Sequence, residues 1–179
     1  MLKSLEEFFD DGGAPPQEGK AEVPIEAALA AWEGPFRQRR IKIVRRVETG
    51  LPQVLIRGDS LRVAVFQILR NVYDSLPGGG TLTIHVSRDA SSGGITARFS
   101  DTGPGFSPKA LSALFTPFSS ARTGHLGLGL CLARKILRRF GGEIEAANGP
   151  SKGAVVTLSL VPADSAPAFQ LRRYGWSAK

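Results

Sequence analysis

Apolar residues along the chain follow two periods in turn, which divide it into short strands and helices. Residues 81–87 alternate between apolar and polar, as in a strand with one buried face. Residues 59–76 and 127–140 instead repeat apolar side chains at helical spacing. The full pattern predicts helices at 24–32, 59–76, 109–114 and 127–140, and strands at 41–47, 54–56, 81–87, 94–99, 142–147 and 154–161.

The predicted helix at 59–76 has two distinct sides. Its apolar stripe consists of Leu61, Val65, Ile68, Leu69, Val72 and Leu76. Gln67, Asn71 and Asp74 stack at helical spacing on the opposite side. The stripe predicts packing on a sheet. The polar row taken alone favours simple exposure to water, with a binding role as the alternative.

Turn residues and caps set the predicted boundaries. We expect Asp59 or Ser60 to cap the second helix, and Ser107 to cap a short helix with Pro108 at its first position. Gly34-Pro35 predicts a break in the first helix, with a further turn of helix in the basic run after it as the alternative. The order of elements, with two hairpins, predicts an α/β (α+β) two-layer sandwich with a mixed, mostly antiparallel sheet and helices on one face.

Composition limits the organisation and the compartment. A chain of 179 residues with 42% apolar content is long enough for one core. It has no run of about 18 apolar residues, its acidic N-terminus does not resemble a signal peptide, and its single cysteine excludes an internal disulfide. The cytoplasm is therefore the expected compartment, although a longer parent protein could be anchored in a membrane.

We divide the chain into a linker with a short helix (1–35), one domain (36–162) and a C-terminal tail (163–179). The net charge of +7 favours anionic partners such as nucleotides. No aromatic residues alternate with the basic ones, so we expect no nucleic-acid binding, and we expect no membrane contact by this chain.

The segment Ser100–Phe106 is the first candidate for chemistry. Asp101 follows a predicted strand and stands directly before Gly103 and Gly105. A carboxylate beside a backbone without side chains can accept a hydrogen bond from a flat ring that carries an amino group. Taken alone, the segment favours an ordinary turn, because Asp, Gly and Pro are the usual turn residues.

A second candidate lies at the start of the last predicted helix. Gly127-Leu128-Gly129-Leu130 places free backbone N–H groups and the positive end of the helix dipole together, which favours phosphate binding. The segment lacks the Gly-Lys-Ser/Thr of a P-loop and does not lie in a strand–glycine–helix unit. The two common nucleotide-binding folds are therefore disfavoured.

Together these segments carry a resemblance to a known family. Asn71 on a helix, Asp101-x-Gly103-x-Gly105, Phe115-x-x-Phe118 and Gly127–Leu130 are similar to the N, first glycine, F and second glycine boxes of sensor histidine kinases. The resemblance covers residues 36–162 and implies the Bergerat-type fold of the ATPase superfamily that also holds gyrase, MutL and the large heat-shock chaperone. Asn71–Ser75 with Pro77-Gly78-Gly79 is similar to the nitrogen-regulation kinases.

The resemblance implies ATP and Mg²⁺ as ligands. It implies that Asn71 coordinates the metal and that Asp101 accepts a hydrogen bond from the adenine amino group. Gly103 and Gly105 would let the loop approach the purine closely. The implied catalytic residues are Asn71, Gln67 and Arg122. The implied nucleotide-binding residues are Asn71, Asp74, Asp101, Gly103, Gly105, Phe118, Thr123, Gly124, His125, Leu126, Gly127, Leu128, Gly129 and Leu130, with a lid over Ser119–His125 anchored by Phe115 and Phe118.

Three positions depart from the family pattern. Gln67 stands where the family has Asn or Glu; glutamine is no general base, which argues against gyrase-like hydrolysis. Arg122 replaces a lid lysine and retains the ability to pair with phosphate. Ala154 replaces a threonine after Gly153, so the resemblance implies one hydrogen bond fewer toward the nucleotide.

The phosphoacceptor is the largest difference from a complete kinase. The only histidines, His85 and His125, lie inside the resembling region and not on a helix before it. We therefore expect the catalytic half of a kinase, which phosphorylates a histidine on a separate dimerisation domain. A downstream response regulator would then receive the phosphoryl group. A regulatory nucleotide-binding module without kinase activity and an anti-sigma-type serine kinase remain the alternatives.

Overall fold

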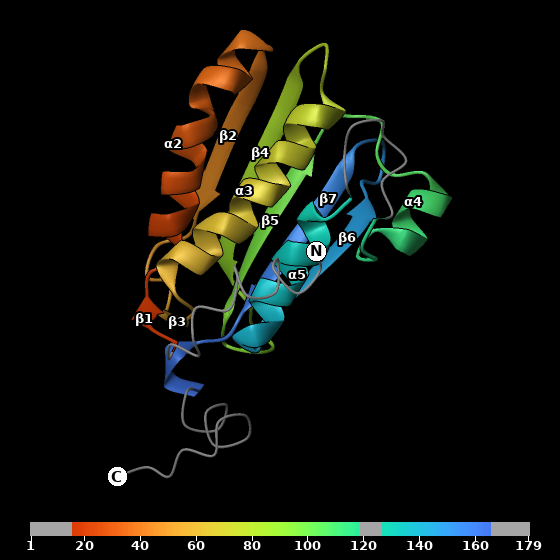
Figure 1. The fold of residues 1–179 in the computed structure, drawn as a ribbon. Helices are drawn as coiled ribbons and strands as arrows, with labels where there is room; N and C mark the ends of the chain where they lie inside the picture. The colour runs from red at the N-terminus through yellow and green to blue at the C-terminus, as the bar shows by residue number, and fades with distance from the viewer. Residues whose placement is uncertain (1–15, 119–126, 166–179) are drawn as a thin grey trace.

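One mixed β-sheet forms the back layer of the molecule. The computed structural model describes residues 16–118 and 127–165 (Figure 1). The sheet has the order β2-β4-β5-β7-β6. Its strands are β2 (Ile41–Val47), β4 (Gly80–Arg88), β5 (Ile95–Asp101), β6 (Glu143–Asn148) and β7 (Ala154–Leu160). The predicted two-layer, mostly antiparallel arrangement is confirmed.

Strand pairing follows the hairpins expected from the sequence, with one parallel exception. β4 pairs with β5, β5 with β7, and β6 with β7, all antiparallel. β2 pairs with β4 in parallel, in a register that joins Ile43 to Leu82. The antiparallel register continues this row from Leu82 to Asp101. Asp101 therefore lies on the same face of the sheet as the buried side chain of Leu82.

The helices cover one face of the sheet (Figure 1). They are α2 (Glu22–Gln38), α3 (Gly58–Ser75) and α5 (Gly129–Arg139), with the short α4 (Pro108–Ala113) beside them. The predicted stripe of α3 is buried, with Leu61, Val65, Ile68 and Leu69 at 0% exposure. Within the described segments, no helix combines the length and the apolar character needed to cross a membrane.

The N-terminal part contributes more to this core than the sequence predicts. α2 continues through Gly34-Pro35, so the predicted break there is wrong. A proline inside a helix removes one backbone hydrogen bond, but Trp32 and Phe36 bury their rings on either side of it. The helix thus crosses the predicted boundary after residue 35, and the extent of the predicted domain 36–162 remains a prediction.

An aromatic cluster joins α2 to α3. The Trp32 ring centroid lies 5.3 Å from that of Tyr73 and 5.2 Å from that of Phe66. The Arg39 guanidinium lies 3.5 Å from the centroid of the Tyr73 ring, and its Nη1 donates to the Tyr73 carbonyl oxygen over 2.8 Å. Stacking and a charged donor on one residue fix the last turn of α3 relative to α2.

A small second sheet also involves the predicted linker. β1 (Glu18–Gly19) pairs antiparallel with β3 (Val54–Leu55). The strand predicted at 54–56 is present as β3, whereas β1 was not predicted, because its pairing depends on a segment far away in the sequence. A 3₁₀ turn, η1 (Ala163–Ser165), closes the described part of the chain.

Of the two predicted N-terminal helix caps, the structure confirms the one at α4. The Ser107 Oγ accepts from the Ala110 N–H over 3.1 Å, as predicted for α4. At α3 the predicted cap by Asp59 or Ser60 is wrong, because Arg57 occupies the cap position and makes no side-chain capping bond. Burial of the α3 stripe stabilises this helix in place of a cap.

Two arginines of α5 attach this helix to the edge strand β6. Arg134 Nε lies 3.0 Å from Glu143 Oε1, and Arg138 Nη2 lies 2.8 Å from Glu143 Oε2. Burial raises the pKa of Glu143, but hydrogen bonds from Arg138, the Ile144 N–H and Arg134 outweigh it and hold the pKa below its ordinary 4.5. The carboxylate therefore stabilises the fold in its ionised form.

Glu143→Gln should weaken the dependence of stability on acidic pH. Because the folded pKa lies below 4.5, the stabilisation by Glu143 is complete above that pH and is lost as the pH falls through the folded pKa. We expect the unfolding free energy of wild type and variant to converge under acid. Urea denaturation at a series of pH values from neutral to acid measures the unfolding free energy of both proteins. Glu145→Gln, on the same strand but without a described ion pair, is the control, and equal behaviour of both variants would contradict the prediction.

Candidate functional site

The site is built around the carboxylate of Asp101 at the end of β5. Asp101 is 7% exposed and is the only buried charged side chain among the described residues. Its Oδ1 accepts from the Gly103 N–H over 2.8 Å and from the Ala154 N–H over 3.3 Å. Oδ2 accepts no hydrogen bond from the described residues. One oxygen thus holds the surrounding backbone, and the second remains available to a ligand.

The loop after Asp101 contacts the end of α3. A Cβ atom at Gly103 would lie 2.8 Å from Asp101 Oδ1 and 3.1 Å from the Ser75 carbonyl oxygen. Such distances leave no room for a side chain. The glycine therefore allows the loop to lie between Asp101 and the helix that carries Asn71 and Asp74.

Asn148, at the end of β6, clamps the second glycine of the loop. Its Oδ1 accepts from the Phe106 N–H over 2.7 Å, and its Nδ2 donates to the Phe106 carbonyl oxygen over 2.9 Å. Gly105 has φ +77°, and a Cβ there would lie 2.7 Å from Asn148 Oδ1. The paired hydrogen bonds fix the loop across the sheet from β5 to β6.

Gly153 closes the site from the other side. It has φ +83°, and a Cβ there would overlap the backbone carbonyl of Asp101. The close approach lets the next N–H, that of Ala154, reach Asp101 Oδ1. Ala154 thus binds Asp101 through its backbone, which does not depend on the threonine that the family pattern would place here.

The polar row of α3 does not simply face water. Gln67, Asn71 and Asp74 are each partly buried. A Cβ at Gly129 would lie 3.0 Å from Gln67 Oε1, so the glycine lets the start of α5 lie against Gln67. The structure therefore brings the N-box helix and the second glycine segment together, with Gly127 and Leu128 partly exposed and Leu130 buried.

The two phenylalanines of the F box differ in environment. Phe115 packs against the core, and the Arg134 guanidinium lies 4.7 Å from its ring centroid. Phe118 is 56% exposed and has φ +62°. Of the two phenylalanines, Phe115 is therefore the one that attaches residues 115–118 to the core.

Part of the predicted site lies outside the described residues. This concerns the lid from residue 119 and the predicted ligands Arg122, Thr123, Gly124, His125 and Leu126. His85 is described: it is exposed on β4, between the buried residues Ile84 and Val86. It therefore lies on the face of the sheet opposite Asp101.

Sequence reasoning missed three residues of the site. Asn148 and Ser75 have no assigned role in the sequence-based prediction, and Gly153 appears there only as the neighbour of Ala154. The spacing of Asn148 before Gly153 gives a weak signal, since asparagine often bonds to backbone groups in turns. Its partner, Phe106, lies 42 positions away, and nothing in the sequence indicates this pairing.

Comparison with known proteins agrees with this geometry. Residues 57–164 match the family model described as histidine kinase-, DNA gyrase B-, and HSP90-like ATPase. The chain belongs to this family. The match spans the elements from α3 to β7, and the sequence-based assignment to the histidine kinase superfamily is confirmed.

The similar curated proteins are sensor kinases. The chain is 29% identical over 122 residues to the sensor histidine kinase ZraS of Klebsiella oxytoca, covering 68% of this chain and 26% of that protein. It is 31% identical over 121 residues to the sensory histidine kinase/phosphatase NtrB of Escherichia coli O157:H7, covering 62% and 34%. The chain spans about a quarter to a third of the length of these relatives.

Solved structures share the fold at low identity. The catalytic domain of histidine kinase ThkA has a TM-score of 0.73 and 18% identity, covering 83% of this chain and 97% of that one. Full-length ShkA in complex with AMPPNP has a TM-score of 0.71 and 21% identity, covering 83% and 32%. The fold is that of a histidine kinase catalytic domain.

Gly153→Ala should destabilise the ATPase domain more than Gly50→Ala. Both glycines have positive φ, which costs another residue about 1–2 kcal/mol. A Cβ at Gly50 meets nothing within 4 Å, whereas at Gly153 it displaces the Asp101 backbone. In urea denaturation, Gly153→Ala should lose more unfolding free energy than Gly50→Ala. Equal losses would show that the close packing against Asp101 does not matter.

Proposed function

We propose that the chain binds Mg²⁺·ATP at this site and donates the γ-phosphoryl group to a histidine on a separate domain. The observation that carries the proposal is the buried Asp101 carboxylate. Its Oδ2 accepts no hydrogen bond from the described residues and lies beside the loop that contains Gly103 and Gly105. The match to an ATPase family supports the nucleotide. ShkA, a protein of the same fold, was solved with AMPPNP.

Asp101 is suited to select adenine. A carboxylate oxygen accepts a hydrogen bond from the adenine amino group, whereas guanine would present a carbonyl oxygen at the same place. Gly103 and Gly105 keep side chains away from the plane of the base. The clamp by Asn148 holds this loop in position before any ligand arrives, which lowers the cost of ordering it on binding.

Asn71 and the start of α5 would serve the phosphates. The described residues hold no cluster of three or more His, Cys, Asp or Glu side chains suited to a metal ion. A metal held mainly by ATP fits this, with the Asn71 amide oxygen as its protein ligand, because Mg²⁺ prefers oxygen. When bound, the ion neutralises charge on the phosphates. Gln67 would hold a water, and Asp74 would contact the nucleotide from the same row.

The second glycine segment and the lid complete the proposed site. Gly127, Leu128, Gly129 and Leu130 would bind phosphate through backbone N–H groups at the start of α5. Arg122 would pair with phosphate oxygens, and Thr123, Gly124, His125 and Leu126 would close over them with Phe118. A lid of this kind excludes water and commits the phosphoryl group to its acceptor.

The acceptor would lie on another domain. Phosphoryl transfer requires positioning and charge more than a protein nucleophile. His85 is on the sheet face opposite Asp101, so it is not placed to receive the group. A helical domain with a histidine, in the same polypeptide or a different one, would accept it and pass it to a response regulator.

Asp101→Ala should lower affinity for ATP, and Asp101→Asn should weaken the preference for ATP over GTP. A buried acceptor left without a donor costs about 1–3 kcal/mol, so wild type should favour ATP by about ten- to a hundredfold. Asparagine can donate to the guanine carbonyl, which reduces this ratio. Calorimetric titration with both nucleotides measures it. Equal affinities of the wild type for ATP and GTP would exclude this role for Asp101.

Labelled Mg²⁺·ATP should give acid-labile, alkali-stable label only when a histidine-bearing helical-hairpin domain is added. The chain alone should stay unlabelled, because His85 lies on the opposite face of the sheet and we expect His125, tethered in the proposed lid beside the phosphates, not to attack in line. Asn71→Ala should lower the yield of label. It should also lower the affinity for Mg²⁺·ATP more than the affinity for metal-free ATP.

Two results would contradict the transfer proposal. Acid-stable label on a serine would favour the alternative of a serine kinase, and stoichiometric label on the isolated chain would remove the need for a separate acceptor. Arg98→Ala, on the opposite face of the sheet, is the control for Asn71→Ala, and we expect it to transfer as wild type does.

A further inference from the structure

β2 is an edge strand with free backbone groups. Among the described residues it pairs only with β4. The Arg40 carbonyl oxygen accepts from the Gly80 N–H over 3.3 Å, and the Glu48 N–H donates to the Val86 carbonyl oxygen over 2.9 Å. In a parallel pair, alternate residues direct both backbone groups to the same neighbour. The backbone groups of Ile41, Ile43, Arg45 and Val47 therefore point to the open edge.

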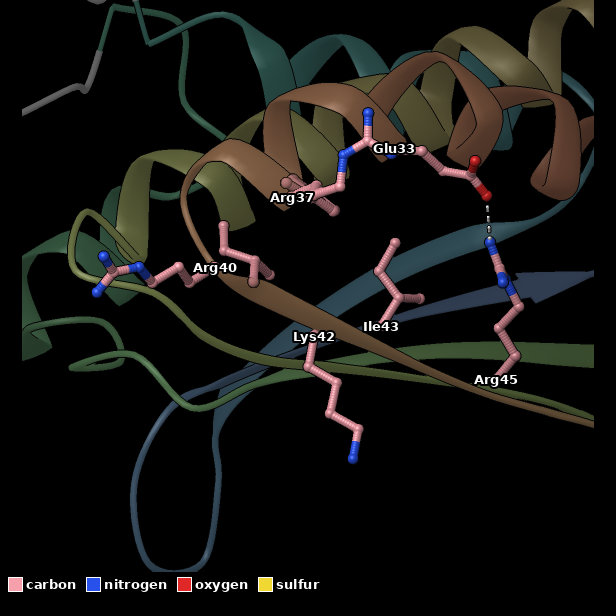
Figure 2. Close-up of a pocket in the computed structure, with 8 residues that line it drawn as sticks. Glu33, Arg37, Arg40, Lys42, Ile43 and Arg45 are labelled. Carbon is pink, nitrogen blue, oxygen red and sulfur yellow. Dashed lines mark hydrogen bonds and ion pairs between the residues drawn. The ribbon is translucent and has the colours of Figure 1, made fainter.

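A groove runs between this edge and α2 (Figure 2). Its volume is about 400 Å³. It is lined by Glu33, Phe36, Arg37, Arg40, Ile41, Lys42, Ile43 and Arg45. Ile43 and Arg45 point toward α2, where Arg45 pairs with Glu33 over 3.1 Å. The apolar base of the groove is formed by Phe36, Ile41 and Ile43.

Basic side chains that form no ion pair within the described part of the chain flank the edge. Lys42 points away from α2 (Figure 2), and Arg46 lies four residues further along β2, on the same face. Lys42, Arg46, Arg37 and Arg40 make no ion pair with any described residue. Arg45 differs from them, because Glu26 and Glu33 already neutralise it.

We propose that the edge of β2 accepts an extended segment of a partner protein in which acidic and apolar residues alternate. Such a segment would add a sixth strand by backbone hydrogen bonds, with its side chains alternating between the two faces. Its apolar side chains enter the groove against Ile41 and Ile43. Its acidic side chains lie on the open face, opposite Lys42 and Arg46, where cross-strand pairs of opposite charge stabilise a sheet.

The charges disfavour the other occupants of an edge. A second copy of this chain would bring Lys42 and Arg46 against their own counterparts, and like charges directly opposite each other oppose pairing. The groove holds one aromatic side chain, Phe36, which is 0% exposed, so it offers no surface on which nucleic-acid bases could stack. An acidic strand meets neither obstacle.

The proposed surface is separate from the nucleotide site. β4 lies between β2 and β5, whose end carries Asp101. The basic residues at the edge do not take part in the contacts of Asp101, Gly103 or Asn148. Partner binding and nucleotide binding can therefore be measured, and can fail, independently.

The test uses the full chain and a capped peptide of alternating glutamate and valine, about as long as β2. Amide shifts in nuclear magnetic resonance should move for the open-edge residues of β2 and the end of α2, and binding should weaken as salt rises. The same peptide with its alternate amides N-methylated retains its charges but cannot donate to the edge, so we expect it not to bind.

Charge reversal distinguishes the edge from a generally basic surface. Lys42→Glu/Arg46→Glu should weaken the glutamate peptide at least about tenfold, while Arg88→Glu/Arg98→Glu, with the same change in net charge, should bind nearly as wild type. Equal loss in both double variants would overturn the proposal. So would binding of the N-methylated peptide, tighter binding of a lysine–valine peptide or of single-stranded DNA, or the absence of shifts at β2.

Discussion

The bonds from backbone N–H groups to Asp101 Oδ1 are the constraint on which the site depends. A buried carboxylate is tolerated only where hydrogen bonds replace the water that it has lost. Two donors, from Gly103 and Ala154, come from different segments and meet at one oxygen. This requirement draws the loop after β5 and the start of β7 together, and it explains why side chains are excluded at Gly103 and Gly153.

The sheet distributes the remaining parts of the site around that carboxylate. α3 packs on the sheet through its apolar stripe and therefore presents Gln67, Asn71 and Asp74 away from it. α5 begins against Gln67 because Gly129 has no side chain. Arg39 and Tyr73 attach the end of α3 to α2, so a helix outside the glycine boxes helps to position Asn71. The proposed nucleotide site thus depends on packing well beyond the residues that would bind the nucleotide.

The family was predictable from local sequence. Asp101 with its two glycines, Asn71 on a helix and the glycines before α5 carried the resemblance, and the family match confirms it. The hydrophobic pattern and the turn residues between its segments also predicted the five sheet strands, and short hairpins join two of the pairs. These features depend on neighbours in the sequence, which is why they can be inferred from it.

The sequence by itself determined the family and indicated which segments form the five-stranded sheet and the helices α3, α4 and α5. Only the tertiary structure decided that α2 continues through Pro35, since burial of Trp32 and Phe36 outweighs one lost hydrogen bond. It also decided that Asn148 clamps Phe106 and that β2 lies at an open edge. Each of these depends on contacts between segments far apart in the chain, which local periodicity does not encode.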